Sequence, residues 1–404
     1  MPARAINLRQ IFSSTALLVL FAAAEVEAKF VRSDFVPVDR LIANVEKILR
    51  SEPNNKEAIY TLGRLHSLAF ADGSHSVEIY NRGNIPQFGH ASTPEVILKQ
   101  EGIKDKESAM KHLSESLRLY RMSVEKDPKN ALYWFSYAWV LEQGASFASE
   151  VDAPFKNGAV KMTSDAWKTE SLKDFRTAFR LCSGSDLSRR GFLAGDKNIV
   201  SQEAALAILE TFKGKKLTPH ELNEQTRLQS HLKKIKTSPR FVTPIIFPLN
   251  SSQTYLNLTS GKRSSTFDLT GDGVKRKWDW VSPETGILVW DAKRTGKIKS
   301  GRQLFGSVTW WMFWENGYAP LQALDDNRDG LLTGLELRGI SVWIDSNGNG
   351  ISDPGEVTPA NLFGIRAIRV RPDSGAHAIL CNSLGIELKD GTTRPSYDWV
   401  PKSN

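Results

Sequence analysis

The sequence predicts an α+β chain of more than one domain, an all-α region followed by a smaller β-rich region. Helical periodicity of the apolar residues extends from about residue 29 to about residue 237 and then stops. From about residue 263 short apolar segments, separated by Gly and Asp turns, take its place. A chain of 404 residues is long enough to bury two hydrophobic cores.

Residues 1–28 are predicted to be a signal peptide. Arg4 and Arg9 give a positive start, an apolar run follows over 11–24, and Val26-Glu27-Ala28 resembles a small-x-small cleavage site. The apolar run is short beside the roughly 20 residues that span a bilayer. We therefore expect a secreted or periplasmic protein. Uncleaved anchoring is the alternative, and membrane contact is expected only in that case.

The domain predicted for residues 29–237 is built from amphipathic helices. Two stretches, Pro53–Gly63 and Pro128–Ala138, resemble the junction between tetratricopeptide repeats, and Trp134 occupies the expected aromatic position. Loop-like insertions at about 73–105 and 145–164 depart from the regular repeat. The resemblance implies a surface for a protein or peptide partner, and a plain helical scaffold is the alternative. The individual helices are expected at Asp39–Arg50, Lys106–Lys126, Asp165–Leu181, Ser201–Phe212 and Pro219–Lys236, with Thr218 as the last N-cap.

Residues 238–262 contain Pro239, Pro244 and Pro248 and are interpreted as an interdomain linker. The β-rich domain is then expected over 263–404. Its strands are predicted at Ser341–Ile344, Ile365–Val370, Ala376–Leu380 and Gly385–Lys389, with a hairpin turn at Asp390-Gly391 and a short helix at about Gly334–Arg338.

Two segments of this domain have the spacing of EF-hand calcium loops. Asp325–Glu336 and Asp345–Glu356 each place oxygen ligands at positions 1, 3 and 5, glycine at 6 and glutamate at 12. Calcium takes six to eight oxygen ligands, and a short loop supplies them only by turning sharply at the glycine. Solvated Asx and Gly turns are the alternative. The predicted ligands are Asp325, Asn327, Asp329, the Leu331 carbonyl and Glu336, and then Asp345, Asn347, Asn349, the Ile351 carbonyl, Asp353 and Glu356.

Two further segments are incomplete versions of the same loop. The stretch after Phe267 offers Asp268, Thr270, Asp272 and Asp279 as a third candidate set. The stretch Asp291–Gly296 carries Lys293 where an oxygen ligand belongs, and its ammonium group would repel the ion. We predict no metal at Asp291–Gly296.

The C-terminal part resembles the EF-hand-like calcium domain of secreted bacterial proteins. The motifs that carry the resemblance are Phe267–Gly273, Ser300–Gly306, Asp325–Glu356 and the closing segment 394–399, and together they cover about residues 241–404. The resemblance implies calcium as the bound ion and brings no known activity with it. The aromatic run Trp310–Trp314 is interpreted as a buried cluster, with sugar stacking or membrane-interface contact as alternatives.

The net charge and the cysteine content restrict the partners and the covalent links that we expect for this protein. Most of the formal charge of +8 lies in the N-terminal part, and no nucleic-acid motif accompanies it, so we expect a solvated basic surface and no nucleic acid partner. Cys182 and Cys381 are either two thiols or an interdomain disulfide.

No catalytic residues are identified, because the usual nucleophile, zinc and phosphate motifs are missing from the sequence. We expect an exported calcium-binding protein whose helical domain holds a protein or peptide, with calcium mainly structural. The alternatives are a calcium-stabilised envelope enzyme acting on polysaccharide and a dockerin-like assembly module. Two carboxylates in a pocket away from the loops would favour the enzyme.

Overall fold

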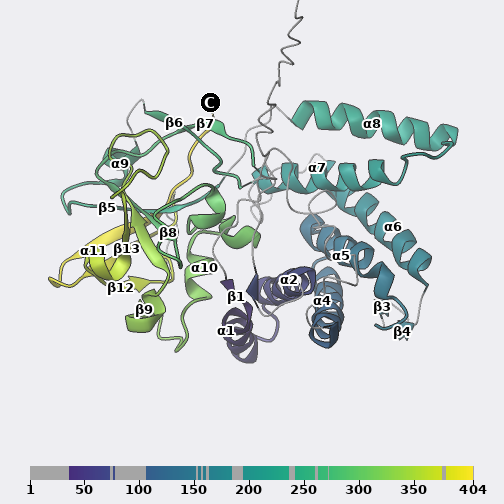
Figure 1. Cartoon of the computed structure of the whole chain (residues 1–404), viewed down its shortest axis with the longest axis horizontal. Coiled ribbons are helices and arrows are strands. Elements are labelled where there is room, and N and C mark those ends of the chain that lie inside the picture. Colours follow the sequence, from purple (N-terminus) through teal and green to yellow (C-terminus); the bar gives the residue numbers. More distant parts are fainter. Residues whose placement is uncertain are drawn as a thin grey trace, which may run out of the picture.

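The structure, a computed structural model, has helices in its N-terminal part and a curled antiparallel sheet in its C-terminal part (Figure 1). The α+β prediction is therefore confirmed. The predicted signal peptide lies outside the described residues. These are 36–72, 76–77, 106–151, 153–155, 158–160, 163–183, 194–235, 242–259, 263–271, 273–374 and 379–403.

The N-terminal part is a row of antiparallel helices, each packed on the next. Ser, Asn and Thr side chains set several of the helix starts. Asn130 accepts a hydrogen bond from the Leu132 N–H, and Thr218 and Glu221 bond to each other's backbone N–H groups in a capping box. The Thr218 cap is thus confirmed. The helices are α1 (Val38–Ser51), α2 (Lys56–Asp72), α4 (Lys106–Lys126), α5 (Ala131–Gly144), α6 (Ser164–Ser183), α7 (Ala194–Glu210) and α8 (Pro219–Ile235).

Small and aromatic residues bring these helices together. Gly63 of α2 faces Tyr120 of α4 so closely that an added Cβ would lie 2.9 Å from the ring. The rings of Tyr60 and Tyr133 stack with centroids 5.0 Å apart, which joins α2 to α5. The insertion at 145–164 holds a short hairpin of β3 (Ala153–Phe155) and β4 (Gly158–Val160).

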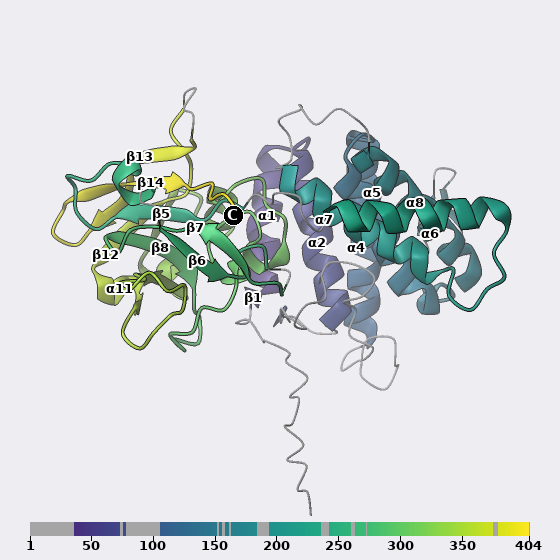
Figure 2. The same cartoon turned by 90° about the horizontal axis from the view of Figure 1, so that it is seen from above.

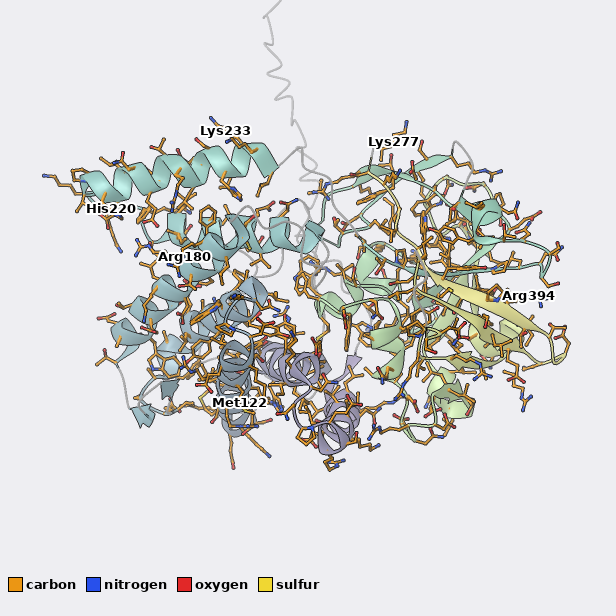
Figure 3. The ribbon with its side chains drawn as sticks, turned by 180° about the vertical axis from the view of Figure 1, so that it is seen from behind. Met122, Arg180, His220, Lys233, Lys277 and Arg394 are labelled. Atoms are coloured by element: carbon orange, nitrogen blue, oxygen red, sulfur yellow. The ribbon has the colours of Figure 1, made fainter. Side chains whose placement is uncertain are left out.

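An eight-stranded antiparallel sheet forms the second part. Its strand order is β11-β10-β8-β5-β14-β13-β12-β9. A separate hairpin pairs β6 (Ser264–Phe267) with β7 (Arg276–Asp279), and its Trp278 is buried while Lys277 points to solvent (Figure 3). The strands of the large sheet are β5 (Ile245–Pro248), β8 (Thr285–Trp290), β9 (Leu331–Thr333), β10 (Ile340–Trp343), β11 (Val357–Pro359), β12 (Ile365–Arg369), β13 (Cys381–Leu388) and β14 (Thr393–Asp398).

The sheet begins earlier than the predicted boundary at residue 263. Strand β5 lies within the segment 238–262, which the sequence analysis interpreted as a linker, and it occupies the middle of the sheet between β8 and β14. This strand was not predicted because Pro244 and Pro248 lie at its two ends, and proline usually marks a loop. The strand predicted at Ala376–Leu380 is not observed at residues 379 and 380, the two of its residues that the structure describes. Residues 375–378 are outside the described part, and β13 starts at Cys381.

Helices α1 and α2 lie between the sheet and the remaining helices (Figures 1 and 2). The fold therefore places the first two helices against the loops at one side of the sheet. Cys182 and Cys381 are both free thiols, so no disulfide links the two parts. In the described part of the chain, no helix combines the length and apolarity that a bilayer crossing requires.

Candidate metal centre

The first predicted loop is closed by its own leading aspartate. Asp325 follows helix α10 (Tyr318–Gln322), and its carboxylate accepts hydrogen bonds from the N–H groups of Arg328 and Gly330, at 2.7 and 3.0 Å. Gly330 has a φ of +86°, in the left-handed region that favours glycine. The chain therefore turns at position 6, as the calcium-loop pattern requires.

The second loop repeats this closure. Asp345 follows β10 and accepts a hydrogen bond from the Gly350 N–H at 2.8 Å, and Gly350 has a φ of +69°. In both loops the residues at positions 3 and 5 form Asx turns with the backbone two residues ahead, at 2.7 to 3.0 Å. Two segments that share only a spacing in the sequence thus share a local fold.

The glutamates at position 12 link both ends of their loops. The Glu336 carboxylate accepts hydrogen bonds from the N–H groups of Asp326 and Thr333, at 2.7 and 3.0 Å. The Glu356 carboxylate accepts from the same two positions of the second loop, at 2.8 and 3.0 Å. The side chain that would close a calcium shell therefore lies over each loop.

The leading aspartates are in an electrostatically unfavourable place. Burial raises the pKa of both Asp325 and Asp345 despite their backbone hydrogen bonds, and the carboxylates of Glu336 and Glu356 add to the rise. Among the described residues, no three His, Cys, Asp or Glu side chains are gathered into a group that could hold a metal ion. The carboxylates instead bond to the backbone N–H groups of their own loops.

The two loops lie at opposite edges of the sheet. The first leads into edge strand β9, and the second connects β10 to edge strand β11. Strand β9 pairs with β12, and β11 pairs with β10, so the loops do not pair with each other through these strands. Each loop is thus a separate candidate site.

The third candidate set is brought together only in part. Asp268 closes its turn on the Gly273 N–H at 3.0 Å. Thr270, however, accepts a hydrogen bond from the Arg276 guanidinium at 2.8 Å, which places a positive charge beside a predicted ligand. Asp279 ends strand β7, and Asp272 lies outside the described residues.

The loop Asp291–Gly296 has the same closure without a ligand set. Asp291 accepts hydrogen bonds from the N–H groups of Thr295 and Gly296, both at 2.8 Å. Lys293 lies in the turn. The loop at Asp291 thus shares the aspartate-led turn with the two complete loops and differs from them in lacking a glutamate at position 12.

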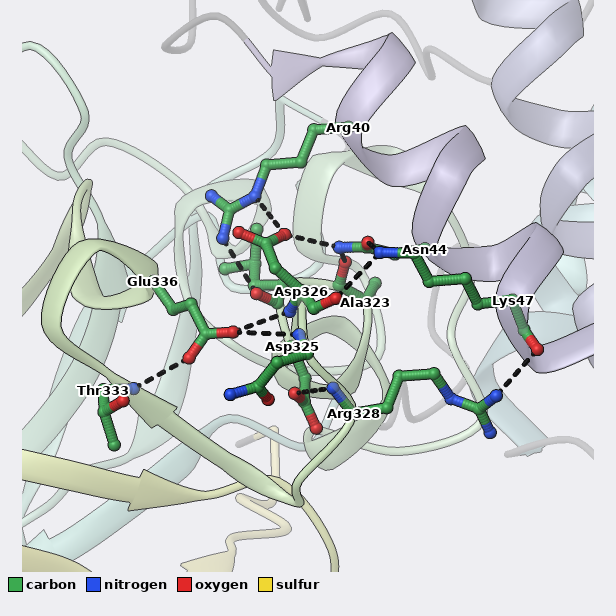
Figure 4. A network of polar contacts seen from close by, with 11 residues as sticks. Arg40, Asn44, Lys47, Ala323, Asp325, Asp326, Arg328, Thr333 and Glu336 are labelled. Carbon is green, nitrogen blue, oxygen red and sulfur yellow. Dashed lines mark hydrogen bonds and ion pairs between the residues drawn. The ribbon is translucent and has the colours of Figure 1, made fainter.

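Position 2 of the first loop attaches the loop to helix α1 (Figure 4). The Asp326 carboxylate accepts hydrogen bonds from Arg40 and Asn44, both at 2.8 Å, and the Asp326 carbonyl accepts one from Lys47 at 2.7 Å. Burial opposes ionisation of Asp326, but the bonds from Arg40 and Asn44 lower its pKa. The contact is an ion pair between the two parts of the protein.

Position 4 of the same loop reaches the end of helix α1. The Arg328 guanidinium donates to the Lys47 carbonyl at 2.8 Å and to the Ser51 hydroxyl at 2.9 Å. A cation at a helix C-terminus is favoured by the helix dipole. Asp326 and Arg328 were not predicted as functional residues, because positions 2 and 4 carry no ligand in the calcium pattern. Their charge was the available signal.

The aromatic run Trp310–Trp314 is buried, as predicted, and each of its residues is at most 6% exposed. Its backbone is strained, because Trp310, Trp311 and Phe313 all have positive φ values of 54° to 59°. The buried Arg64 of α2 donates to the Trp311 carbonyl at 3.2 Å. The run therefore forms a second contact between the helices and the sheet.

Comparison with known proteins found a matching domain family and a similar protein. The SPM domain family matches residues 249–398. The iron-regulated protein FrpA of Neisseria meningitidis serogroup C is 30% identical over 165 residues, which are 38% of this chain and 15% of FrpA. The chain thus aligns with a small share of that relative. The SPM match includes both complete loops and most of the sheet.

Proposed function

We propose that this protein binds calcium in the loops Asp325–Glu336 and Asp345–Glu356, and that the ions have a mainly structural role. The observation that supports the proposal best is the shared placement of Glu336 and Glu356. Each carboxylate spans positions 2 and 9 of its loop, and the loop at Asp291 lacks such a group. The oxygen-only donor set suits a hard cation.

The ligands would be the carboxylate and amide oxygens at positions 1, 3, 5 and 12 and the carbonyl at position 7 of each loop, with the Asp353 carboxylate at position 9 of the second loop. Bound calcium would supply positive charge to carboxylates that burial and mutual repulsion disfavour. The residues at positions 2 and 4 of the first loop, Asp326 and Arg328, hydrogen-bond to helix α1 instead. Calcium that stabilises the first loop would therefore also stabilise the contact between the helices and the sheet.

The helical part is proposed to hold a protein or peptide partner in an exported protein. The antiparallel row of helices α1 to α8 and the tetratricopeptide-like junctions before α2 and α5 support this role. The predicted signal peptide supports a secreted or periplasmic location.

Metal stoichiometry tests the calcium proposal. We expect calorimetric titration of the metal-free, full-length protein to show two calcium ions per chain. Glu336→Gln and Glu356→Gln should each remove or greatly weaken one site, because glutamine loses the charge and the bidentate carboxylate. Lys293→Ala is the control and should leave two sites. A metal-free wild-type protein that takes up no calcium at millimolar concentration would refute the proposal.

A further inference from the structure

A cavity of about 270 Å³ lies between the helices and the sheet domain. Helices α1, α2 and α5 form one wall. The opposite wall consists of the segment from Phe313 to Ala323, which leads into the first loop, together with residues 370–372. Neither part of the protein forms this cavity alone.

The floor of the cavity is lined by aromatic residues, and the polar groups of three of them, Tyr60, Trp314 and Tyr318, are hydrogen-bonded within the protein. Tyr60, Tyr133, Phe313, Trp314 and Tyr318 all line it. Tyr133 is 3% exposed, and its hydroxyl forms no hydrogen bond within the described part of the chain. Buried hydroxyl groups are normally paired, so this one is available to a bound group.

The charges at the cavity are mostly negative. Glu52 lies in the turn between α1 and α2, Glu57 lies in α2, and Glu315 comes from the opposite wall. Burial raises the pKa of Tyr133, and the carboxylates of Glu57 and Glu315 raise it further, which places both near the unpaired hydroxyl. Lys56 also lines the cavity, but its ammonium group is 2.9 Å from Asp127 and 3.9 Å from Glu57.

The backbone that leads into the opposite wall is held in an energetically unfavourable conformation. The positive φ values of Trp310, Trp311 and Phe313 immediately precede Trp314 and Glu315, which line the cavity. Strained backbone of this kind persists only where the surrounding structure enforces it, and it concentrates at functional sites. Here the strain places an aromatic ring and a carboxylate opposite Glu57.

We propose that this cavity binds a lysine or arginine side chain of a partner polypeptide. The aromatic floor would contact the cation and its aliphatic stem, Glu57 and Glu315 would pair with its charge, and the Tyr133 hydroxyl would accept a hydrogen bond from it. The inference rests on the proposed partner-binding role of the helices and specifies the chemistry of the partner.

A neutral sugar is the competing ligand, because aromatic rings and carboxylates also line sugar sites. Charge favours the cation. Three glutamates face the cavity, while Lys56 is engaged by Asp127 and Arg371 is exposed to solvent. A cation would add counter-charge to the three glutamates, which Lys56 supplies only in part because it lies 3.9 Å from Glu57 and is bonded to Asp127.

The test compares two peptides that differ only in charge, Ac-Gly-Arg-Gly-NH2 and its citrulline counterpart. Saturation-transfer NMR on the full-length protein in calcium should show saturable binding of the arginine peptide and none of the citrulline peptide. Glu57→Gln and Glu315→Gln should each weaken binding by up to about fivefold, as expected for partly exposed ion pairs. Glu115→Gln changes a partly exposed glutamate of α4 that pairs with Arg118 and does not line the cavity, and it should leave binding unchanged.

Each other outcome overturns the inference. Equal binding of both peptides would indicate a neutral ligand, as would binding of a soluble oligosaccharide alone. Unchanged affinity in Glu57→Gln and Glu315→Gln, with circular dichroism showing folded protein, would place the peptide elsewhere, and failure of both peptides to bind would reject the site. Calcium binding is measured separately, so an empty cavity in a protein that takes up two ions leaves the calcium proposal standing.

Discussion

Chelation of calcium is expected to lower the melting temperature of this protein by about 10–20 °C. A ligand at a hundredfold excess over its dissociation constant stabilises the folded state by about 2.7 kcal/mol per site. For a domain of about 150–250 residues, each kcal/mol shifts the melting temperature by about 2–4 °C. Differential scanning calorimetry with and without chelator measures this effect. An unchanged transition in protein shown to be metal-free by elemental analysis would reject the structural role.

The two loops should not contribute equally to that stability. Glu336 bonds to the N–H of Asp326, whose side chain holds α1 through Arg40 and Asn44. Glu356 has no comparable connection through Ser346 among the hydrogen bonds of the described residues. Glu336→Gln should therefore lower the melting temperature more than Glu356→Gln, and Lys293→Ala should not lower it. Equal losses would mean that the first loop does not support the contact with α1.

Replacement of Asp398 by asparagine is expected to stabilise the protein at alkaline pH. Asp398 is 4% exposed and accepts a hydrogen bond from the Gly317 N–H at 3.0 Å, but burial raises its pKa to about 8. Between about pH 4 and pH 8 the folded protein therefore keeps a proton that the unfolded chain releases. The free energy of unfolding should fall with rising pH in this range, by about 1.4 kcal/mol per pH unit from this group.

Chemical denaturation at several pH values measures that slope. Asp398→Asn should flatten it, with a gain of several kcal/mol near pH 8. Asp174, which is buried in α6 and whose pKa burial raises to about 7, contributes in the same direction over a narrower range. The exposed turn residue Asp390 is a matched control, because its pKa is lowered by its bonds to Thr392. An equally steep slope in Asp398→Asn would show that Asp398 does not carry the effect.

Local patterns in the sequence predicted the parts of the structure that depend on local contacts. The helix starts near Thr218 and after Pro128 follow from capping and proline, and the calcium-loop spacing predicted where Gly330 and Gly350 turn the chain. The buried aromatic run followed from its composition. These features depend on residues within a few positions of each other.

Features that depend on distant residues were not predicted. Strand β5 is short and bounded by prolines, and its place in the sheet is set by β8 and β14. The cavity joins Glu57 to Glu315, and the loop contact joins Asp326 to Arg40, which are 286 residues apart. A single sequence does not show which residues pair in this way, because Glu57 and Asp326 lie in motifs whose patterns carry no information about Glu315 or Arg40. The elements could therefore be predicted better than their assembly.

The position of β5 in the sheet also determines the order in which the two parts of the protein can fold during synthesis. Ile246 pairs with Tyr397, about 150 residues later, and with Ile287 on its other side. The helices, in contrast, each pack on the next helix along the chain, so their contacts join residues closer in sequence than the pairing of β5 with β14 does. As the chain emerges from the ribosome, the helical row has its partners early, whereas the sheet cannot close until strand β14 has been made. Completion of the sheet therefore follows synthesis of the helices, the calcium loops and β14, and cannot precede any of them.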